Sequence, residues 1–282
     1  MSIAKGTLYV VATPIGNLDD LTPRAAETLR QADLICAEDT RRCRTLLSHC
    51  GANTPTLAYH EHNERKLLER ILERLRQGIA IALVSDAGTP LVSDPGFPLV
   101  RACHQQGIPV SPIPGPSAAI AALSASGLPS DRFVFEGFLP RQGAQRRAHL
   151  QTLTAETRTL LFYEASHRIL ETLTDLIAVF GDQRPAVLAK ELTKLHERIL
   201  SAPLATLRER LEAEPELQRG EFVLLLAGAE PATGELPAEA RRTLRILLAE
   251  LPLKQAVALA ARITGAQRNA LYAEAVGMQG EG

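Results

Sequence analysis

Short apolar runs that alternate with helical patterns are the strongest constraint on the fold of this chain. Residues 8–12 (LYVVA), 34–37 (LICA) and 79–84 (IAIALV) are each continuously apolar. They lack the alternation of apolar and polar residues typical of a half-exposed strand, so we expect both faces of these strands to be buried. A helical pattern follows each run. Residues 1–127 are therefore predicted to form an α/β domain around a parallel sheet, with helices on both faces.

Residues 128–229 are predicted to form a second α/β domain. Its apolar runs, at 132–138, 159–163 and 221–226, alternate more with polar residues. Helical patterns lie between these runs, which indicates a mixed sheet covered by helices. Residues 230–237 (EPATGELP) have the composition of a linker, and residues 238–282 are predicted to form a small domain of short helices.

The composition is that of a globular protein and excludes several classes. Hydrophobic residues make up 45% and charged residues 22% of the 282-residue chain. A formal net charge of −1 argues against a globally basic nucleic-acid binder, although it leaves room for a local basic face. No apolar run approaches the ~20 residues that cross a bilayer. The first residues resemble a strand more than a signal peptide, so we expect a cytoplasmic protein without membrane contact.

The cysteines and the missing motifs narrow the chemistry further. Cys36, Cys43, Cys50 and Cys103 form no CxxC pair, which fits reduced thiols in the cytosol and disfavours a zinc site. The P-loop, the glycine-rich turn of dinucleotide-binding domains and the GxSxG serine elbow are all absent. The segment 60–62 (HEH) could suggest a metal, but alternating residues on an extended segment usually diverge. Exposed or RNA-facing polar residues are the favoured interpretation, and no metal is expected.

The stretch 82–96 (ALVSDAGTPLVSDPG) joins a buried strand to a loop of small residues. We expect the next helix to begin there, with Asp94 as N-cap and Pro95 at the first helical position. A loop of this kind lets backbone amides approach a ligand closely. A tight turn without a ligand explains the same residues, and the stretch by itself does not decide between the two.

Six segments of small, polar and charged residues follow one another along the chain: 13–22 (TPIGNLDDLT), 37–42 (AEDTRR), 85–96 (SDAGTPLVSDPG), 114–127 (PGPSAAIAALSASG), 163–168 (YEASHR) and 190–194 (KELTK). In this order and spacing they resemble the ribosomal RNA small subunit methyltransferase I family, within the tetrapyrrole-methylase-like (class III) S-adenosylmethionine enzymes. The resemblance runs from about residue 6 to residue 226 and includes the final helical piece. Two turns depart from the wider superfamily: GxGPGD is ATPIGN at 12–17, and GGDP is AGTP at 87–90, with the acidic residue displaced to Asp86.

The resemblance implies a two-domain α/β enzyme of the tetrapyrrole-methylase-like fold, with a small helical appendage at its C-terminal end. S-adenosylmethionine would bind in the cleft between the two α/β domains, without a metal. The implied reaction is 2′-O-methylation of a cytidine in the decoding region of 16S rRNA, on the small ribosomal subunit. The superfamily also suggests a homodimer.

Contacts with the methyl donor follow from the same motifs. Small residues would let backbone amides approach the donor, and Ile15, Val92 and Leu192 would supply apolar walls. Ser117 also fits an ordinary helix N-cap. The residues that the resemblance implies for the donor are Ile15, Ala87, Gly88, Thr89, Val92, Ser117, Ala118, Glu164 and Leu192.

Charged residues at the end of the second predicted strand and in the segment 190–194 (KELTK) are the candidates for catalysis. Transfer of a methyl group from a sulfonium depends mainly on placement of the acceptor oxygen. A ribose hydroxyl is a poor nucleophile, so a base, or a cation that stabilises the alkoxide, would help. A carboxylate and an arginine after a strand can equally form an ion pair that supports the loop. The candidates are Glu38, Asp39, Arg41, Lys190, Glu191 and Lys194.

Clusters of arginine are the candidates for RNA contact. Solvated helix faces also carry such runs, so no single cluster is decisive, but several at the rim of one cleft favour RNA. With four Tyr, seven Phe and no Trp, recognition is expected to depend on backbone charge and shape more than on base stacking. The predicted RNA residues are Arg41, Arg42, Arg44, Arg141, Arg146, Arg147 and Arg168. A further set in the last helices comprises Arg241, Arg242, Arg245, Lys254, Arg262 and Arg268.

Two other functions stay open at this point. A small-molecule methylase of the tetrapyrrole type would share the fold, but the basic segments 37–42 and 141–147 are not needed for a small substrate. A non-catalytic assembly factor that binds rRNA is the second alternative. Such a factor would not have to bind the donor.

Overall fold

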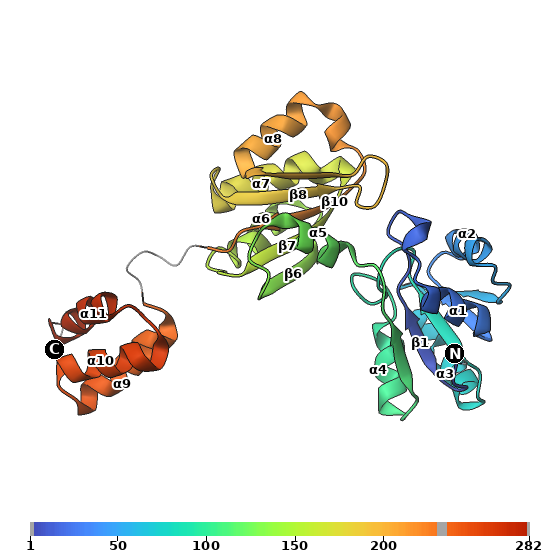
Figure 1. The fold of residues 1–282 in the computed structure, drawn as a ribbon, viewed down its shortest axis with the longest axis horizontal. Coiled ribbons are helices and arrows are strands. Elements are labelled where there is room, and N and C mark those ends of the chain that lie inside the picture. Colours follow the sequence, from blue (N-terminus) through green and yellow to red (C-terminus); the bar gives the residue numbers. More distant parts are fainter. Residues whose placement is uncertain (1–2, 230–235, 281–282) are drawn as a thin grey trace. The chain divides into compact units, whose positions relative to one another are not determined.

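The computed structural model describes residues 3–229 and 236–280, and its first α/β unit is built on a five-stranded parallel sheet in the order β3-β2-β4-β1-β5. Every strand pair in this sheet is parallel, as the continuous apolar runs predicted. Figure 1 shows these strands in the blue-to-green part of the chain. The strands are β1 (Leu8–Val11), β2 (Leu34–Ala37), β3 (Thr56–Ala58), β4 (Ile81–Val84) and β5 (Val110–Ile113).

Helices cover both faces of the first sheet. Ala82 and Val84 of β4 pack in one core with α1 and α2, whereas Ile81 and Leu83 pack in another core with α3 and α4. This division follows from the opposite directions of successive side chains in a strand. The helices are α1 (Pro23–Gln31), α2 (Thr40–Cys50), α3 (Glu64–Arg76) and α4 (Phe97–Gln105), with the short 3-10 helix η1 (Leu18–Asp20) before α1.

Local capping explains where two of these helices begin, and it corrects the prediction for a third. The side chain of Thr22 accepts a hydrogen bond from the backbone N–H of Ala25 at the start of α1. Asp39 caps α2 in the same way, through the backbone N–H of Arg41. The predicted N-cap at Asp94 is wrong: α4 begins at Phe97, and its N-cap is Gly96, whose φ is 125°.

The second sheet is mixed, as predicted, with the strand order β6-β7-β10-β8-β9. β6 pairs with β7 in parallel and the other pairs are antiparallel. The sequence pattern predicted β6, β7 and β10, whereas β8 and β9 were not predicted. The strands are β6 (Phe133–Phe138), β7 (Thr159–Ala165), β8 (Pro185–Lys190), β9 (Arg198–Pro203) and β10 (Glu221–Leu226).

Helices again cover both faces of this sheet, and α5 (Ala118–Ser126) is one of them. Ala119, Ala122 and Leu123 of α5 pack against Leu161 and Val187 of the second sheet; Figure 1 shows α5 against these strands. The sequence reading assigned α5 to the first domain, yet its buried face belongs to the second core. The opposite face carries α6 (Gly143–Gln151), α7 (Ile169–Phe180) and α8 (Leu204–Ala213); the short 3-10 helices are η2 (Ser166–Arg168) and η3 (Pro215–Gln218).

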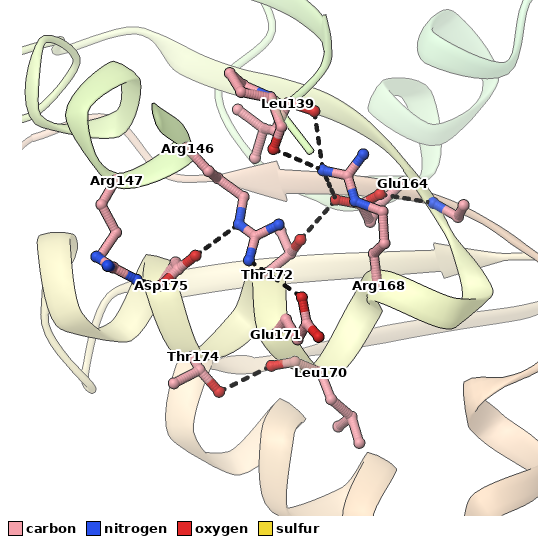
Figure 2. Close-up of polar contacts among 12 residues, drawn as sticks. Leu139, Arg146, Arg147, Glu164, Arg168, Leu170, Glu171, Thr172, Thr174 and Asp175 are labelled. Carbon is pink, nitrogen blue, oxygen red and sulfur yellow. Dashed lines mark hydrogen bonds and ion pairs between the residues drawn. The ribbon is translucent and has the colours of Figure 1, made fainter. Parts of the chain in front are cut away.

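A buried ion-pair network joins α6 to α7 (Figure 2). Arg146 Nε contacts Asp175 Oδ2 at 2.6 Å, and Arg147 Nη1 contacts Asp175 Oδ1 at 2.8 Å. The side chains of Arg146 and Asp175 are only 3% and 7% exposed. Burial alone would raise the pKa of Asp175, but hydrogen bonds from Arg147 and Arg146 outweigh it and lower that pKa. Asp175 therefore stays ionised between the two arginines.

A second set of polar contacts ties the end of β7 to the loop after β6 (Figure 2). Arg168 Nη2 donates to the carbonyl oxygens of Leu139 at 2.9 Å and Pro140 at 3.1 Å, and lies 3.3 Å from Glu164 Oε2. The hydroxyl of Thr172 donates to the same carboxylate oxygen at 2.6 Å. The buried charge of Glu164 is thus satisfied within the domain.

The C-terminal residues form a separate compact unit, which divides from the rest between Gly228 and Ala229. Its helices are α9 (Ala238–Glu250), α10 (Leu253–Thr264) and α11 (Arg268–Gly280), around a core that includes Leu244, Val257 and Leu271. The predicted helical piece is confirmed. Residues 230–235 of the predicted linker lie outside the described residues. In the described ranges, the search for a helix long and apolar enough to cross a membrane finds none.

We predict that Asp175→Ala lowers the free energy of unfolding by about 3 to 5 kcal/mol, because it leaves the buried guanidinium of Arg146 with only the exposed carboxylate of Glu171, at 3.5 Å, as its ion-pair partner. Urea unfolding followed by circular dichroism measures the effect. The matched control is Glu171→Ala, since Glu171 contacts the same arginine from a side chain that is 71% exposed and should change stability by less than about 1 kcal/mol. Equal effects of the two variants would contradict the prediction.

Candidate functional site

A cavity of about 380 Å³ lies where loops of the first sheet meet the ends of strands of the second sheet. Its volume is within the range of small-molecule sites. All of the residues predicted for the methyl donor, from Ile15 to Leu192, are among those that line it. The structure therefore brings these positions around one cavity, although their contact with a donor stays a prediction. The other lining residues are Glu38, Arg42, Asp86, Ser93, Asp94, Phe138, Tyr163, Ala165, Ala189, Lys194, Glu221, Phe222 and Val223.

The loops after β1 and β4 are joined by a pair of backbone hydrogen bonds. The N–H of Thr13 donates to the carbonyl of Gly88 at 2.8 Å, and the N–H of Gly88 donates to the carbonyl of Thr13 at 3.0 Å. Gly88 has a φ of +81°, and a Cβ built on it would lie 3.4 Å from Ile15 Cγ2. Glycine is thus favoured by the backbone conformation, whereas a Cβ alone would make only an ordinary contact with Ile15.

The loop after β5 is held against the loop after β4. The hydroxyl of Thr89 donates to the carbonyl of Pro116 at 3.1 Å. Ser117 is the N-cap of α5, but its side chain makes no capping hydrogen bond. The N–H of Ala119 instead donates to the hydroxyl of Tyr163 at 3.2 Å. The start of α5 is therefore fixed by a side chain from β7, and Ser117 is not needed as an ordinary cap.

Glu164 and Tyr163 point to opposite faces of β7. The side chain of Glu164 has no exposed surface, because it is held by Thr172 and Arg168 against α7 (Figure 2). Only its main chain can reach the cavity that it lines. Tyr163 faces the cavity side, where its ring packs edge-on against Phe135 and Phe138. Neither Tyr163 nor Phe138 was identified from the sequence.

Carboxylates gather at the same cavity. Burial, together with the nearby charges of Glu38 and Asp86, raises the pKa of Asp94 to about 6, although a hydrogen bond from Ser85 lowers it. Burial also raises the pKa of Glu38, whose Oε2 accepts the N–H of Asp86 at 3.3 Å. Asp86 Oδ2 in turn lies 3.1 Å from Arg42 Nη1. From the sequence we predicted Asp94 as a helix N-cap, and we did not predict that it lines the cavity.

The predicted catalytic residues divide into two groups. Glu38 and Lys194 line the cavity, whereas Lys190 is buried, and Asp39 pairs with the exposed side chain of Arg41. That hydrogen-bonded pair lowers the pKa of Asp39 to about 2.

Lys194 belongs to an ion cluster at the cavity edge. Its Nζ lies 2.8 Å from Glu191 Oε1 and 3.0 Å from Glu221 Oε2. Burial opposes the charge of both Lys194 and Glu191, but their hydrogen bonds raise the pKa of Lys194 and lower that of Glu191. The amine of Lys194 therefore stays charged, and it is poorly suited to accept a proton.

The arginines that were predicted to contact RNA differ in their exposure to solvent. Arg41, Arg42, Arg44, Arg141 and Arg147 are exposed. Arg146 is 2% exposed and is held by Asp175, so the structure removes it from the surface that was predicted to meet RNA (Figure 2). The side chain of Arg168 is 12% exposed and is held by Glu164 and two carbonyls, with the same consequence. Clustering in the sequence could not separate these roles, because the partners come from α7 and β7.

The histidine segment after β3 forms no metal site. His60 and His62 stack edge to face at 5.9 Å. Within residues 3–229 and 236–280, no group of three or more His, Cys, Asp or Glu is arranged to hold a metal ion.

Comparison with known proteins identifies the family. The model of the tetrapyrrole (corrin/porphyrin) methylases matches residues 7–208, and that of the RsmI C-terminal HTH domain matches residues 234–279. The ribosomal RNA small subunit methyltransferase I of Pseudomonas aeruginosa is 56% identical over 281 residues, which cover 99% of this chain and 100% of that protein. The chain belongs to the ribosomal RNA small subunit methyltransferase I family. The protein of the same name from Escherichia coli O157:H7 is 53% identical, over 98% of this chain and 97% of that protein.

Solved structures show the same fold at lower identity. Uroporphyrin-III C-methyltransferase from Thermus thermophilus, complexed with S-adenyl homocysteine, has a TM-score of 0.54 at 20% identity and covers 78% of this chain and 96% of that chain. The cobalt precorrin-4 methyltransferase has a TM-score of 0.56 at 16% identity, over 79% and 95% of the two chains. The expected tetrapyrrole-methylase-like α/β fold is therefore confirmed for this family member.

We predict that the carboxyl of Asp94 titrates with a pKa of about 6, and that Asp86→Asn lowers this value by removing a nearby negative charge. Because burial is the larger cause, the pKa in the variant should still lie above the ordinary value of 3.8. Carbon-13 NMR of labelled aspartate carboxyls measures both. Asp131→Asn, at a side chain that is 80% exposed, is the control and should leave Asp94 unchanged. A pKa near 3.8 in the native protein would refute the burial of Asp94.

Proposed function

We propose that this protein transfers a methyl group from S-adenosylmethionine to the ribose 2′-oxygen of a cytidine in the decoding region of 16S rRNA, on the small ribosomal subunit. The main support is the single cavity that gathers the residues implied for the donor from three loops of the first sheet and from β7 and the loop after β8. Relatives that are more than half identical over nearly the whole chain carry the name of an rRNA methyltransferase.

The shape and charge of the cavity fit S-adenosylmethionine. Gly88 leaves room at one wall, and Ile15, Val92 and Leu192 offer apolar surface to the adenosine. Glu38, Asp86 and Asp94 place negative charge at the same cavity, which suits a ligand that carries a positive sulfonium. These groups would hold the donor without a metal.

The chain contributes placement and a proton acceptor. S-adenosylmethionine supplies a methyl group on a cationic sulfur, which needs no covalent help from the protein. Asp94 is the residue best placed to take the proton of the ribose hydroxyl, because a carboxylate with a pKa of about 6 is a stronger base than an ordinary one. Glu38, whose pKa is also raised, lies nearby and is the second candidate for this role. Lys194 keeps its charge at the cavity edge and would stabilise negative charge that develops on the oxygen.

The exposed arginines are proposed to hold the RNA backbone. Arg41, Arg42 and Arg44 lie in the first turns of α2, directly after Glu38, and Arg141 and Arg147 lie beside the loop after β6. Cations at these positions would bind phosphates and leave the cavity to the reacting nucleoside. We also propose a cytoplasmic location and a homodimer. Light scattering of the purified protein tests whether it is a homodimer.

The decisive experiment uses small ribosomal subunits from a strain that lacks this methyltransferase. The purified full-length protein and labelled S-adenosylmethionine should transfer label to these subunits and not to subunits from the parent strain. Alkaline hydrolysis then locates the product, because a 2′-O-methyl group protects the next phosphodiester bond. Label on a base, or no transfer to subunits alongside transfer to tetrapyrroles, would overturn the proposed function.

We predict that Gly88→Val abolishes binding of S-adenosylhomocysteine, measured by calorimetry, because a branched side chain at this position enters the cavity beside Ile15. The positive φ also adds backbone strain of about 1 to 3 kcal/mol. Gly107→Val is the matched control: Gly107 has a φ of +67°, and its Cβ would meet nothing within 4 Å. It should show similar strain with native affinity. Native affinity in both variants would place the donor elsewhere.

We predict that Asp94→Asn lowers kcat/KM for methyl transfer about 100-fold or more, since the amide cannot accept a proton. Native activity should fall as the pH drops through about 6, where the carboxyl of Asp94 becomes protonated, and the variant should lose this dependence. Affinity for S-adenosylhomocysteine serves as the control and should stay within a few fold. Asp39→Asn provides the contrast, because the pKa of about 2 at Asp39 puts its titration far below this range.

We predict that replacing Arg41 and Arg44 together by Ala weakens binding to small subunits and reduces the slope of log affinity against log salt by about 1 to 2, as lost phosphate contacts require. Donor affinity should not change. Arg208→Ala, at an exposed arginine on α8 paired with Glu212, is the control. An unchanged salt slope in the double variant would exclude these arginines from the RNA surface.

A further inference from the structure

A second cavity, of about 600 Å³, adjoins the first and shares three of its residues. Glu38, Ser93 and Asp94 line both cavities, so they form a common wall. Beyond this wall the second cavity is bounded by the segment 60–64, from His60 to Glu64, and by the segment 95–98 at the start of α4. A ligand in the second cavity would thus lie beside the carboxylates that face the first.

An exposed aromatic side chain forms part of this second cavity. Phe97, the first residue of α4, is 61% exposed, although the protein has only seven Phe and no Trp. It is not needed for the core of the first sheet, which is closed on this face by Leu99 and Cys103 of the same helix. An exposed ring at a cavity is a surface on which a nucleobase can stack.

The polar groups of the second cavity favour a ligand that donates hydrogen bonds. Glu38, Glu61, Glu64 and Asp94 line it, and its lining includes no Lys or Arg. Four carboxylates would repel a phosphate, whereas they can accept hydrogen bonds from ribose hydroxyls and from the amino group of cytosine. His60 adds a buried Nδ1 atom that has no hydrogen-bond partner in the described part of the chain.

Carboxylates line the second cavity, whereas arginines lie on the neighbouring helix α2. Arg42, which contacts Asp86, lines the first cavity but not the second, and Arg41 and Arg44 are exposed on the same helix. Phosphates of a polynucleotide would therefore bind at the start of α2, and an uncharged nucleoside would enter the acidic cavity. A nucleotide must leave its helical stack to bind in this way.

We propose that the second cavity is the site of the acceptor nucleoside, with its base stacked on Phe97 and its ribose against the shared wall of Glu38 and Asp94. The inference rests on the proposed function and specifies where the substrate of that reaction binds. It differs from the expectation that recognition depends on backbone charge and shape more than on base stacking. The shared wall then explains how the ribose hydroxyl and the proton acceptor come together.

The test measures methyl transfer to small subunits that lack the modification. Phe97→Ala should lower kcat/KM about 10- to 100-fold, as loss of a stacked base does, while affinity for S-adenosylhomocysteine stays within about twofold. Phe97→Trp should restore kcat/KM to within about threefold of the native value. Phe97→Leu keeps an apolar side chain without a ring and should behave as Phe97→Ala. The matched control is Ile120→Ala, at a side chain that is 52% exposed on α5 and lines neither cavity.

Phe97→Trp also gives a direct signal, because the chain contains no other tryptophan. Its fluorescence should be quenched when unmethylated small subunits are added, and much less by S-adenosylhomocysteine alone. Ile120→Trp should not be quenched in this way. Since both positions are exposed, the thermal midpoints of the variants should match that of the native protein.

Three results would overturn the inference. They are a kcat/KM of Phe97→Ala within twofold of the native value, an equal loss in Ile120→Ala, and a parallel loss of S-adenosylhomocysteine affinity in Phe97→Ala. Failure of the proposed function is distinguished by the native protein itself. If native protein transfers no methyl group to subunits, the function is wrong; if it does and Phe97→Ala is equally active, only the acceptor site is wrong.

Discussion

The pair of backbone hydrogen bonds between Thr13 and Gly88 is the constraint on which the site depends. β1 and β4 are parallel neighbours, so their carboxyl ends and the loops after them lie at the same edge of the sheet. The antiparallel bridge between these loops is possible because Gly88 adopts a positive φ. With that bridge in place, Ile15 and Thr89 face one cavity, and Thr89 in turn holds the loop after β5 through Pro116.

Acidic and basic side chains of the two α/β domains occupy different surroundings. Carboxylates at the end of β2 and after β4 lie at the cavities, where burial raises the pKa of Asp94 and Glu38. Arg41 and Arg44 are exposed on α2, and Arg42 lines the first cavity beside Asp86, whereas Arg146 and Arg168 are held inside the second domain by Asp175 and Glu164. A buried ion pair contributes little net stability but is costly to break. The main role of Arg146 and Arg168 is therefore to hold neighbouring segments in place. Arg168 in particular holds the loop that follows Phe138, the last residue of β6.

The sequence predicted most of the helices and strands, for physical reasons that are local. Short continuous apolar runs such as 79–84 favour strands buried on both faces, and Thr22 followed by Pro23 is a favourable start for a helix. The family motifs then identified residues around one cavity. The prediction failed at Asp94, because an aspartate before proline resembles a cap, whereas α4 begins at Phe97. It failed at α5, because the pattern of small residues does not reveal which sheet the helix packs on.

The sequence by itself determined the parallel sheet, the mixed sheet, the helical unit at the end and the family, since each follows from apolar periodicity or from ordered short motifs. Only the tertiary structure decided which charged groups face the cavities. The roles of Arg146, Arg168 and Asp94 depend on partners that are distant in the chain: Asp175, Glu164 and Glu38. Exposure and pKa are properties of the surroundings of a side chain, and those surroundings form only when separate strands and helices pack together.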